Sequence, residues 1–285
     1  MGTFAAVLCA VLSSAKDIIS KRLASHLDGT TSTFASFAFA IPYYLLVLAI
    51  LACFGYETIT LAGTFFGLVL LRALSDSMAE GCKMHAFGHG DISVVATFFS
   101  ISPLFMLIIA PMLTGDQTTL HGAVAVAVVV LGSVLLVYHP SARGWAEQKK
   151  GILLAIAAAF FFSLNSCFDR LAVKKGTPVF AGFSMTLVSA LFLLPWVFLR
   201  RDRLTAMRVH QKELWMRGFL EIAFMVTKLY ALQFLPPAYV AGMQRISLVL
   251  SILSGRLIFK EPDFGRRLAA GILILGGVFW IASLQ

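Results

Sequence analysis

The sequence predicts an all-α membrane protein with ten transmembrane helices. Of its 285 residues, 59% are hydrophobic and only 13% are charged, and the mean hydropathy is +0.87. A soluble domain carries about 25% charged residues. Apolar runs of about 20 residues, long enough to cross a bilayer as a helix, follow one another along the chain. The alternative, a large soluble helical core, would leave too little polar surface to solvate it.

Charged positions that recur at a fixed spacing indicate a duplication. Three charges in an apolar segment of the first half have counterparts 145 residues later: Arg72 with Arg217, Asp76 with Glu221, and Lys83 with Lys228. Five helices per unit is an odd number, so the two units must lie inverted in the membrane. We therefore expect two inverted five-helix repeats, residues 1–138 and 151–285, joined by a linker at 139–150. Such repeats are typical of alternating-access carriers.

The first repeat is expected to hold five helices, because turn residues interrupt its apolar pattern. Asp28-Gly29, the stretch 88–91 and Gly115-Asp116 mark three of the breaks. The first apolar segment has no basic n-region and no A-x-A-like cleavage site, so we expect a membrane helix and not a signal peptide. The predicted spans are 3–24, 33–54, 60–85, 91–113 and 119–138.

The second repeat is divided in the same way. Its breaks fall at 176–178, Pro236-Pro237 and Glu261-Pro262, where proline or glycine ends a helical pattern. Gly132 in the last predicted helix of the first repeat lies opposite Gly277 in that of the second. The predicted spans are 151–173, 178–199, 210–234, 238–259 and 265–284.

Several function classes are excluded by what the sequence lacks. The four cysteines have no CxxC spacing, so they are expected to be packing residues and neither a disulfide framework nor a metal site follows. There is no GxSxG, Walker-type or HExxH motif, so we expect no enzyme, no cofactor and no ATP-driven pump. The net charge of +9 lies in loops and at helix ends, which indicates membrane topology and not nucleic-acid binding.

The basic residues gather on one face of the predicted bundle. The opposite face receives little beyond Lys174 and Lys175. Under the positive-inside rule the basic face is cytoplasmic, which predicts a multi-pass protein of the cell (inner) membrane with both termini outside. The basic face carries Lys21, Arg22, Arg143, Lys149, Lys150, Arg200, Arg201, Arg203, Arg208, Lys212, Lys260, Arg266 and Arg267.

Both halves resemble the EamA-type unit of the drug/metabolite transporter superfamily. The matching elements are the arginine that opens the third helix (Arg72, Arg217), the acidic tip after the fourth (Asp116, Glu261), and the glycine-rich fifth helix, LGSVLLV and LGGVFWIA. The resemblance implies a ten-helix secondary carrier of small metabolites with a central cavity lined by both halves. It also implies cytoplasmic termini, which is the reverse of what the charge bias predicts.

The duplicated charges form a stripe on each third helix. At about 100° per residue, Arg72, Asp76, Glu80 and Lys83 fall within about 80° of arc, so all can face a common interior. The i,i+4 spacing predicts local pairs of Arg72 with Asp76 and of Arg217 with Glu221. We interpret both arginines as mainly structural. The neighbouring carboxylates of Asp76 and Glu80 are a candidate proton acceptor.

The candidate substrate ligands are charges without an obvious local partner. Lys228 has no acid within one turn, so it contacts either the substrate or an acid on another helix. Arg245 has no charged counterpart in the first repeat, where the matching region surrounds Ser100. The candidate substrate-binding set is Lys228, Arg245, Glu80, Lys83, Gln244, Tyr230 and Asn165. The candidate counter-charges or proton sites are Asp76, Glu221, Asp169 and Asp17.

These residues favour a secondary transporter for a small polar metabolite with a carboxylate or phosphate, driven by protons, another gradient or a counter-substrate. A zwitterion is compatible, because unpaired acids would suit an amine. One alternative is a flippase for a lipid-linked or phospholipid-like headgroup, which needs a lateral opening for the lipid tail. A membrane-embedded enzyme or receptor is the other, and no catalytic set or signalling domain favours it.

Overall fold

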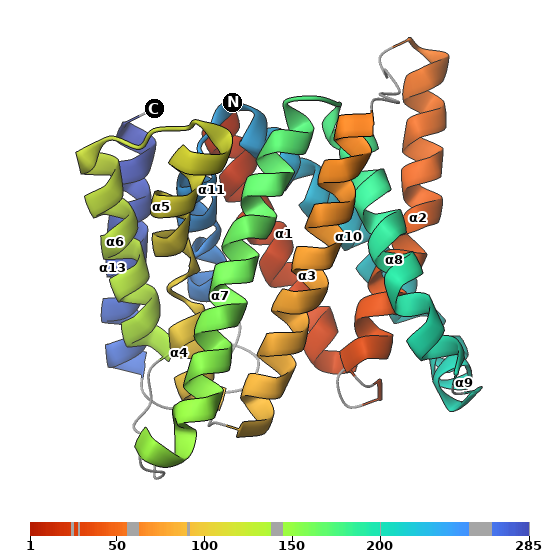
Figure 1. Ribbon diagram of the computed structural model, residues 1–285, viewed down its shortest axis with the longest axis horizontal. Helices are drawn as coiled ribbons and strands as arrows, with labels where there is room; N and C mark the ends of the chain where they lie inside the picture. The colour runs from red at the N-terminus through yellow and green to blue at the C-terminus, as the bar shows by residue number, and fades with distance from the viewer. Residues whose placement is uncertain are drawn as a thin grey trace.

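The chain folds into one bundle of helices that run roughly side by side (Figure 1). The described residues of this computed structural model contain no strand. Both chain termini lie at one end of the bundle, and the short helix α9 (Arg201–Val209) lies at the other. The described residues are 1–23, 26–27, 29–55, 63–89, 92–137, 145–199, 201–250 and 264–284.

The helices follow the predicted spans closely in most of the chain. The remaining helices are α1 (Gly2–Leu23), α2 (Gly29–Cys53), α3 (Gly63–His89), α4 (Ile92–Phe99), α5 (Ser102–Thr114), α6 (Leu120–Val137), α7 (Trp145–Val173), α8 (Pro178–Phe198), α10 (Gln211–Phe234), α11 (Pro237–Gln244) and α13 (Phe264–Ser283).

Three predicted boundaries were wrong. The helix expected at 91–113 is broken into α4 and α5, since Ser100 and Ile101 form turns and Pro103 starts the new helix. The segment expected at 238–259 has a turn at Arg245, and helix resumes over 246–250. The basic stretch after α8 was expected to be a loop but forms α9. The count of ten membrane helices remains a prediction.

The outside of the bundle is apolar and its interior holds charge, as a bilayer requires. Met112 and Phe279 are 81% and 77% exposed, whereas Asp169 is completely buried. Among the described residues, four helices are long and apolar enough to cross a membrane: α1, α2, α7 and α8. Charges such as Arg72 and Asp76 interrupt the apolar pattern of α3, and Glu221 and Lys228 that of α10.

Helices from the two halves of the chain pack against each other. α3 lies along α7, and α10 lies along α1 in the same way. α6 and α13 cross through glycines: a Cβ on Gly132 would lie 2.9 Å from Ile274 Cγ1, and one on Gly277 would lie 2.6 Å from Val129 Cγ2. Residues 132 and 277, like 129 and 274, are 145 positions apart. The two helices therefore run antiparallel and meet through corresponding residues, and small residues allow this close approach.

Candidate functional site

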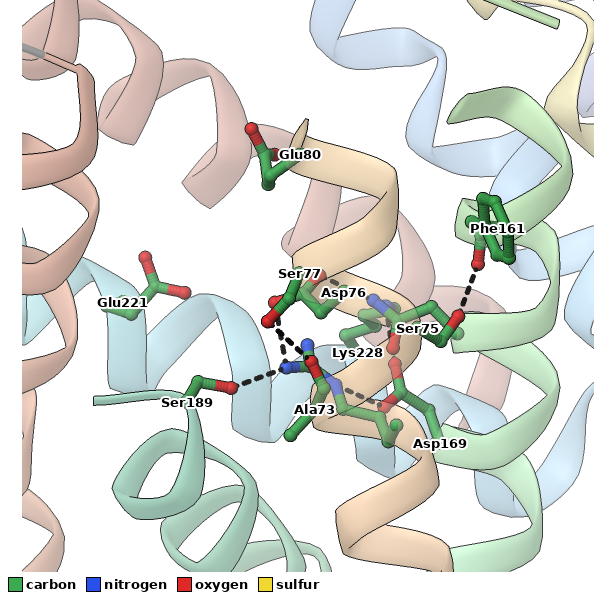
Figure 2. A network of polar contacts seen from close by, with 12 residues as sticks. Ala73, Ser75, Asp76, Ser77, Glu80, Phe161, Asp169, Ser189, Glu221 and Lys228 are labelled. Atoms are coloured by element: carbon green, nitrogen blue, oxygen red, sulfur yellow. Dashed lines mark hydrogen bonds and ion pairs between the residues drawn. The ribbon is translucent and has the colours of Figure 1, made fainter. Parts of the chain in front are cut away.

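A buried carboxylate lies at the centre of the interior charges. Asp169 on α7 accepts a hydrogen bond from Lys228 Nζ on α10 at 2.6 Å and another from Arg72 Nε on α3 at 3.3 Å. Its two oxygens each take one cation, and no part of the side chain is exposed to solvent. Figure 2 shows Lys228 and Asp169 beside the chain of α3 that carries Ala73 and Asp76. One carboxylate thus joins three helices.

The same network continues along α3. Arg72 Nη1 donates to Asp76 Oδ2 at 3.1 Å, as the i,i+4 spacing predicts, and to Ser189 Oγ on α8 at 3.2 Å. Asn165 on α7 donates from Nδ2 to Asp76 Oδ1 at 2.7 Å. The other amide atom, Asn165 Oδ1, is buried and has no hydrogen-bond donor in contact. A buried acceptor without a donor is costly, so it is a candidate ligand atom.

The charged stripe on α10 contacts other helices than the stripe on α3 does. Glu221 on α10 lies 3.2 Å from Lys16 Nζ on α1, and that ammonium also sits 4.0 Å from the centre of the Phe224 ring. Arg217 donates to Ser32 on α2, through both the backbone carbonyl and the hydroxyl. Arg217 and Glu221 thus tie α10 to α2 and α1, and their expected local pair stays a prediction.

Arg245 lies at the break after α11. Its Nη2 donates to Ser102 Oγ at 3.0 Å, at the start of α5. Its Nε is buried and meets no acceptor. Among the described side chains no carboxylate forms an ion pair with it. The guanidinium is therefore a charge with spare hydrogen-bonding capacity inside the protein.

The two helix breaks occur at corresponding positions of the two halves. Ser100 N donates to Thr97 O, and Arg245 N donates to Gly242 O, each three residues back instead of four. The two donor residues, Ser100 and Arg245, are 145 positions apart, and so are the two acceptor residues, Thr97 and Gly242. Interrupted helices of this kind line the substrate and ion sites of many carriers, because their free backbone groups and helix ends can bind ions.

The comparisons with known proteins agree with this architecture. The model of the EamA-like transporter family matches residues 1–138 and 149–283. The chain belongs to the EamA-like transporter family. It is therefore a multi-pass membrane transporter of the drug/metabolite superfamily, whose members are transporters and not enzymes.

One solved structure resembles the EamA-like chain over its whole length. Its title reads "Crystal structure of protein", the TM-score is 0.70 at 16% sequence identity, and the match covers 100% of this chain and 99% of the other. At this identity the likeness shows the fold alone. No curated protein matches the chain.

The other predicted ligands of this EamA-like protein lie in varied surroundings. Lys83 Nζ donates to Glu80 Oε1 at 2.8 Å near the end of α3, and it lies 5.8 Å and 5.5 Å from the ring centres of Phe99 and Phe162. Both side chains are about one-third exposed. The structure therefore does not join Glu80 and Lys83 to the Asp169 network through any described contact.

Three further predicted residues belong to α1, α10 and α11. Gln244 donates to the Sγ of buried Cys9 at 3.1 Å, next to Arg245. Tyr230 is on the surface of α10, with its hydroxyl 3.8 Å from Met1 Sδ. Asp17 is part of α1, but its side chain lies outside the described residues.

A second ion cluster lies at the end of the bundle that holds the termini. Asp116, in the connection after α5, accepts two 2.8 Å hydrogen bonds from Arg170 and one of 3.3 Å from Lys174. Arg170 also donates to Leu232 O. Partial burial alone would raise the pKa of Asp116, but the bonds from Arg170 outweigh it and hold this pKa at about 2.

The contacts of Lys16, Ser102 and Ser189 were not predicted from the sequence. Lys16 did carry a signal, because it is a charge deep in an apolar helix. Ser102 carried a weaker one, since Ser-Pro favours a turn and a new helix start. Nothing in the local pattern distinguishes Ser189 from other small residues of α8.

Proposed function

We propose that this EamA-like protein is a secondary transporter that carries a small polar metabolite with an anionic group by alternating access. The anionic group is a carboxylate or a phosphate, and a zwitterion that keeps this group is compatible. The observation that carries the proposal is Arg245, a partly buried guanidinium whose buried Nε has no acceptor, with one serine contact and no described carboxylate partner.

The charge balance supports an anion. Among the described side chains in the middle of the helices, three cations pair with three carboxylates, and Arg245 remains. The paired groups are Lys16, Arg72 and Lys228 with Glu221, Asp76 and Asp169. Arg217 lies near the start of α10, where an arginine can reach the membrane interface. A guanidinium binds carboxylate or phosphate through strong charge-assisted hydrogen bonds.

Other candidate groups extend the proposed site. Gln244 precedes Arg245, and Asn165 offers a buried acceptor for an O–H or N–H of the substrate. Lys228 is included with its partner Asp169. The carboxylates of Asp169, Asp76, Glu221 and Asp17 supply counter-charge or a proton site. Glu80, Lys83 and Tyr230 remain candidate contacts along the route.

Alternating access rests on two inverted five-helix repeats, proposed as residues 1–138 and 151–285 with the connection 139–150 between them. Two observations support the inversion. The first is that α6 and α13 run antiparallel and contact each other at two glycines that are 145 positions apart in the sequence. The second is that the helix breaks at Ser100 and Arg245 are also 145 positions apart. Repeats of this kind place the site between the halves.

The orientation is proposed from charge. The termini and the basic helix α9 lie at opposite ends of the bundle (Figure 1). If the basic end is cytoplasmic, both termini are outside.

Uptake into proteoliposomes tests the function. Purified protein in vesicles loaded with the same unlabelled anion should accumulate radiolabelled lactate, glutamate or glycerol 3-phosphate, and external unlabelled anion of the same kind should compete. Fluorescent phospholipid in the same vesicles should stay in its leaflet. Movement of the lipid without uptake of any anion would favour the flippase alternative and contradict the proposal.

A further inference from the structure

We infer that this carrier is an obligatory exchanger of monoanions. It switches between its outward-open and inward-open states quickly when an anion is bound and slowly when its site is empty. The inference rests on the proposed function and adds the mode of coupling. It comes from Arg245, at the break between α11 and the following helix, which is the one mid-helix cation among the described side chains without a described carboxylate partner.

The empty site keeps its charge throughout the cycle. An arginine does not lose its proton in a protein, unlike a lysine or a carboxylate. Arg245 therefore cannot become neutral when the substrate leaves. The hydroxyl of Ser102 accepts one of its hydrogen bonds but supplies no negative charge.

Other described interior cations keep a carboxylate partner when no substrate is bound. Lys228 and Arg72 are held by Asp169 at 2.6 and 3.3 Å, and Lys16 is held by Glu221 at 3.2 Å. Each of these cations is neutralised within the protein whether or not substrate is present. The net charge of the site thus depends on what binds Arg245.

An alternating-access carrier passes through a state in which its site is closed to both faces. Closing removes water from the site. With a monoanion on Arg245, the closed site is neutral and its N–H groups are hydrogen-bonded. Without an anion, closing buries an unpaired guanidinium, and taking an ion out of water without a partner is strongly unfavourable.

The empty carrier should therefore return at least about tenfold more slowly than the loaded one, since the cost of an unpaired buried charge exceeds the free energy of one factor of ten. A second consequence concerns substrate charge. A dianion would leave the closed site with one negative charge, so a monoanion or a singly protonated phosphate fits best.

Efflux from preloaded proteoliposomes tests the inference. The probes are radiolabelled lactate and glutamate, which each carry a net charge of −1 at neutral pH. Efflux into buffer that contains the same unlabelled anion should be at least about tenfold faster than efflux into buffer without a transportable anion, with sulfate as the external salt. The exchange should also be indifferent to a potassium diffusion potential set with valinomycin, because equal charges cross in opposite directions.

The outcomes separate the two proposals. Equal efflux with and without external anion, or efflux that follows the membrane potential, would overturn the exchange inference while leaving an anion transporter. Failure to transport either probe, together with uptake of glycerol 3-phosphate that rises with pH as its dianion forms, would overturn the assignment to monoanions. No uptake of any of the three anions would contradict the proposed function itself.

Discussion

Lys228 Nζ lies 2.6 Å from Asp169 Oδ2, and the other oxygen of this fully buried carboxylate accepts from Arg72. Lys228, which has no acid within a helical turn, thus finds one on α7. The contact links α10 to α7 inside the bundle, and Arg72 extends it to α3. The only cation near the middle of the described helices without such a partner is Arg245.

Replacement of Asp169 should be strongly destabilising. Asp169→Asn leaves Arg72 and Lys228 without a shared counter-charge and should cost about 3–5 kcal/mol, seen as a lower melting temperature in detergent. Lys228→Met in the same chain should restore part of the loss, with a coupling of about 0.5–3 kcal/mol in a double-mutant cycle. Additive effects of the two substitutions would contradict the pairing.

The Asp116 cluster makes the stability of the protein dependent on acid. Because the pKa of Asp116 is about 2 in the folded protein and 3.8 in its ordinary state, its ionised form stabilises the fold above about pH 4, and this contribution is lost as the pH falls towards 2. Asp116→Asn should cost about 1 kcal/mol at neutral pH, after allowance for solvent screening at this partly exposed site. Melting curves from pH 7 to 2 should show the difference between the two proteins shrink. A difference that stays constant over this range would exclude the assignment.

The crossing of α6 and α13 should not tolerate a side chain at Gly277. A Cβ there would meet Val129 Cγ2 at 2.6 Å and the Ala125 carbonyl at 3.1 Å, so Gly277→Ala should cost about 1–3 kcal/mol. Gly276→Ala is the matched control, since its Cβ would meet nothing within 4 Å and alanine favours the helix. Equal melting temperatures for the two variants would show that the helices do not meet as described.

The orientation can be read from thiol labelling. In a cysteine-free background, Gln117→Cys and Thr205→Cys lie at opposite ends of the bundle, and both positions are exposed. An impermeant maleimide added to intact cells should label Gln117→Cys and leave Thr205→Cys unlabelled until the cells are opened. The reverse pattern would place the termini in the cytoplasm.

The sequence allowed the family, the helical fold and most of the interior charges to be predicted, because charge inside an apolar segment is costly and therefore conspicuous. The local pair of Arg72 and Asp76 follows from helical spacing alone. The contact between Asp169 and Lys228 does not, since it depends on which helices become neighbours.

The break between α4 and α5 shows a second limit. The segment 92–113 carries no charge and is mostly apolar, and hydropathy does not register a turn within such a segment. Only Ser102-Pro103 marks the new helix start. The contact of Ser102 with Arg245 joins positions 143 residues apart, and nothing in either local sequence signals it. The lack of a described carboxylate partner at Arg245 depends on which acid each other described mid-helix cation contacts, and the local sequence does not specify those contacts.

The most direct test of the account is the affinity of the protein for lactate or glutamate before and after Arg245→Gln, measured by isothermal titration calorimetry. Arg217→Gln is the matched control, because it removes another arginine whose described contacts are with Ser32. Arg245→Gln should weaken anion binding at least about tenfold, and Arg217→Gln should leave the affinity within about threefold of the original protein. Unchanged affinity in a folded Arg245→Gln protein would contradict the claim that this arginine binds the anion.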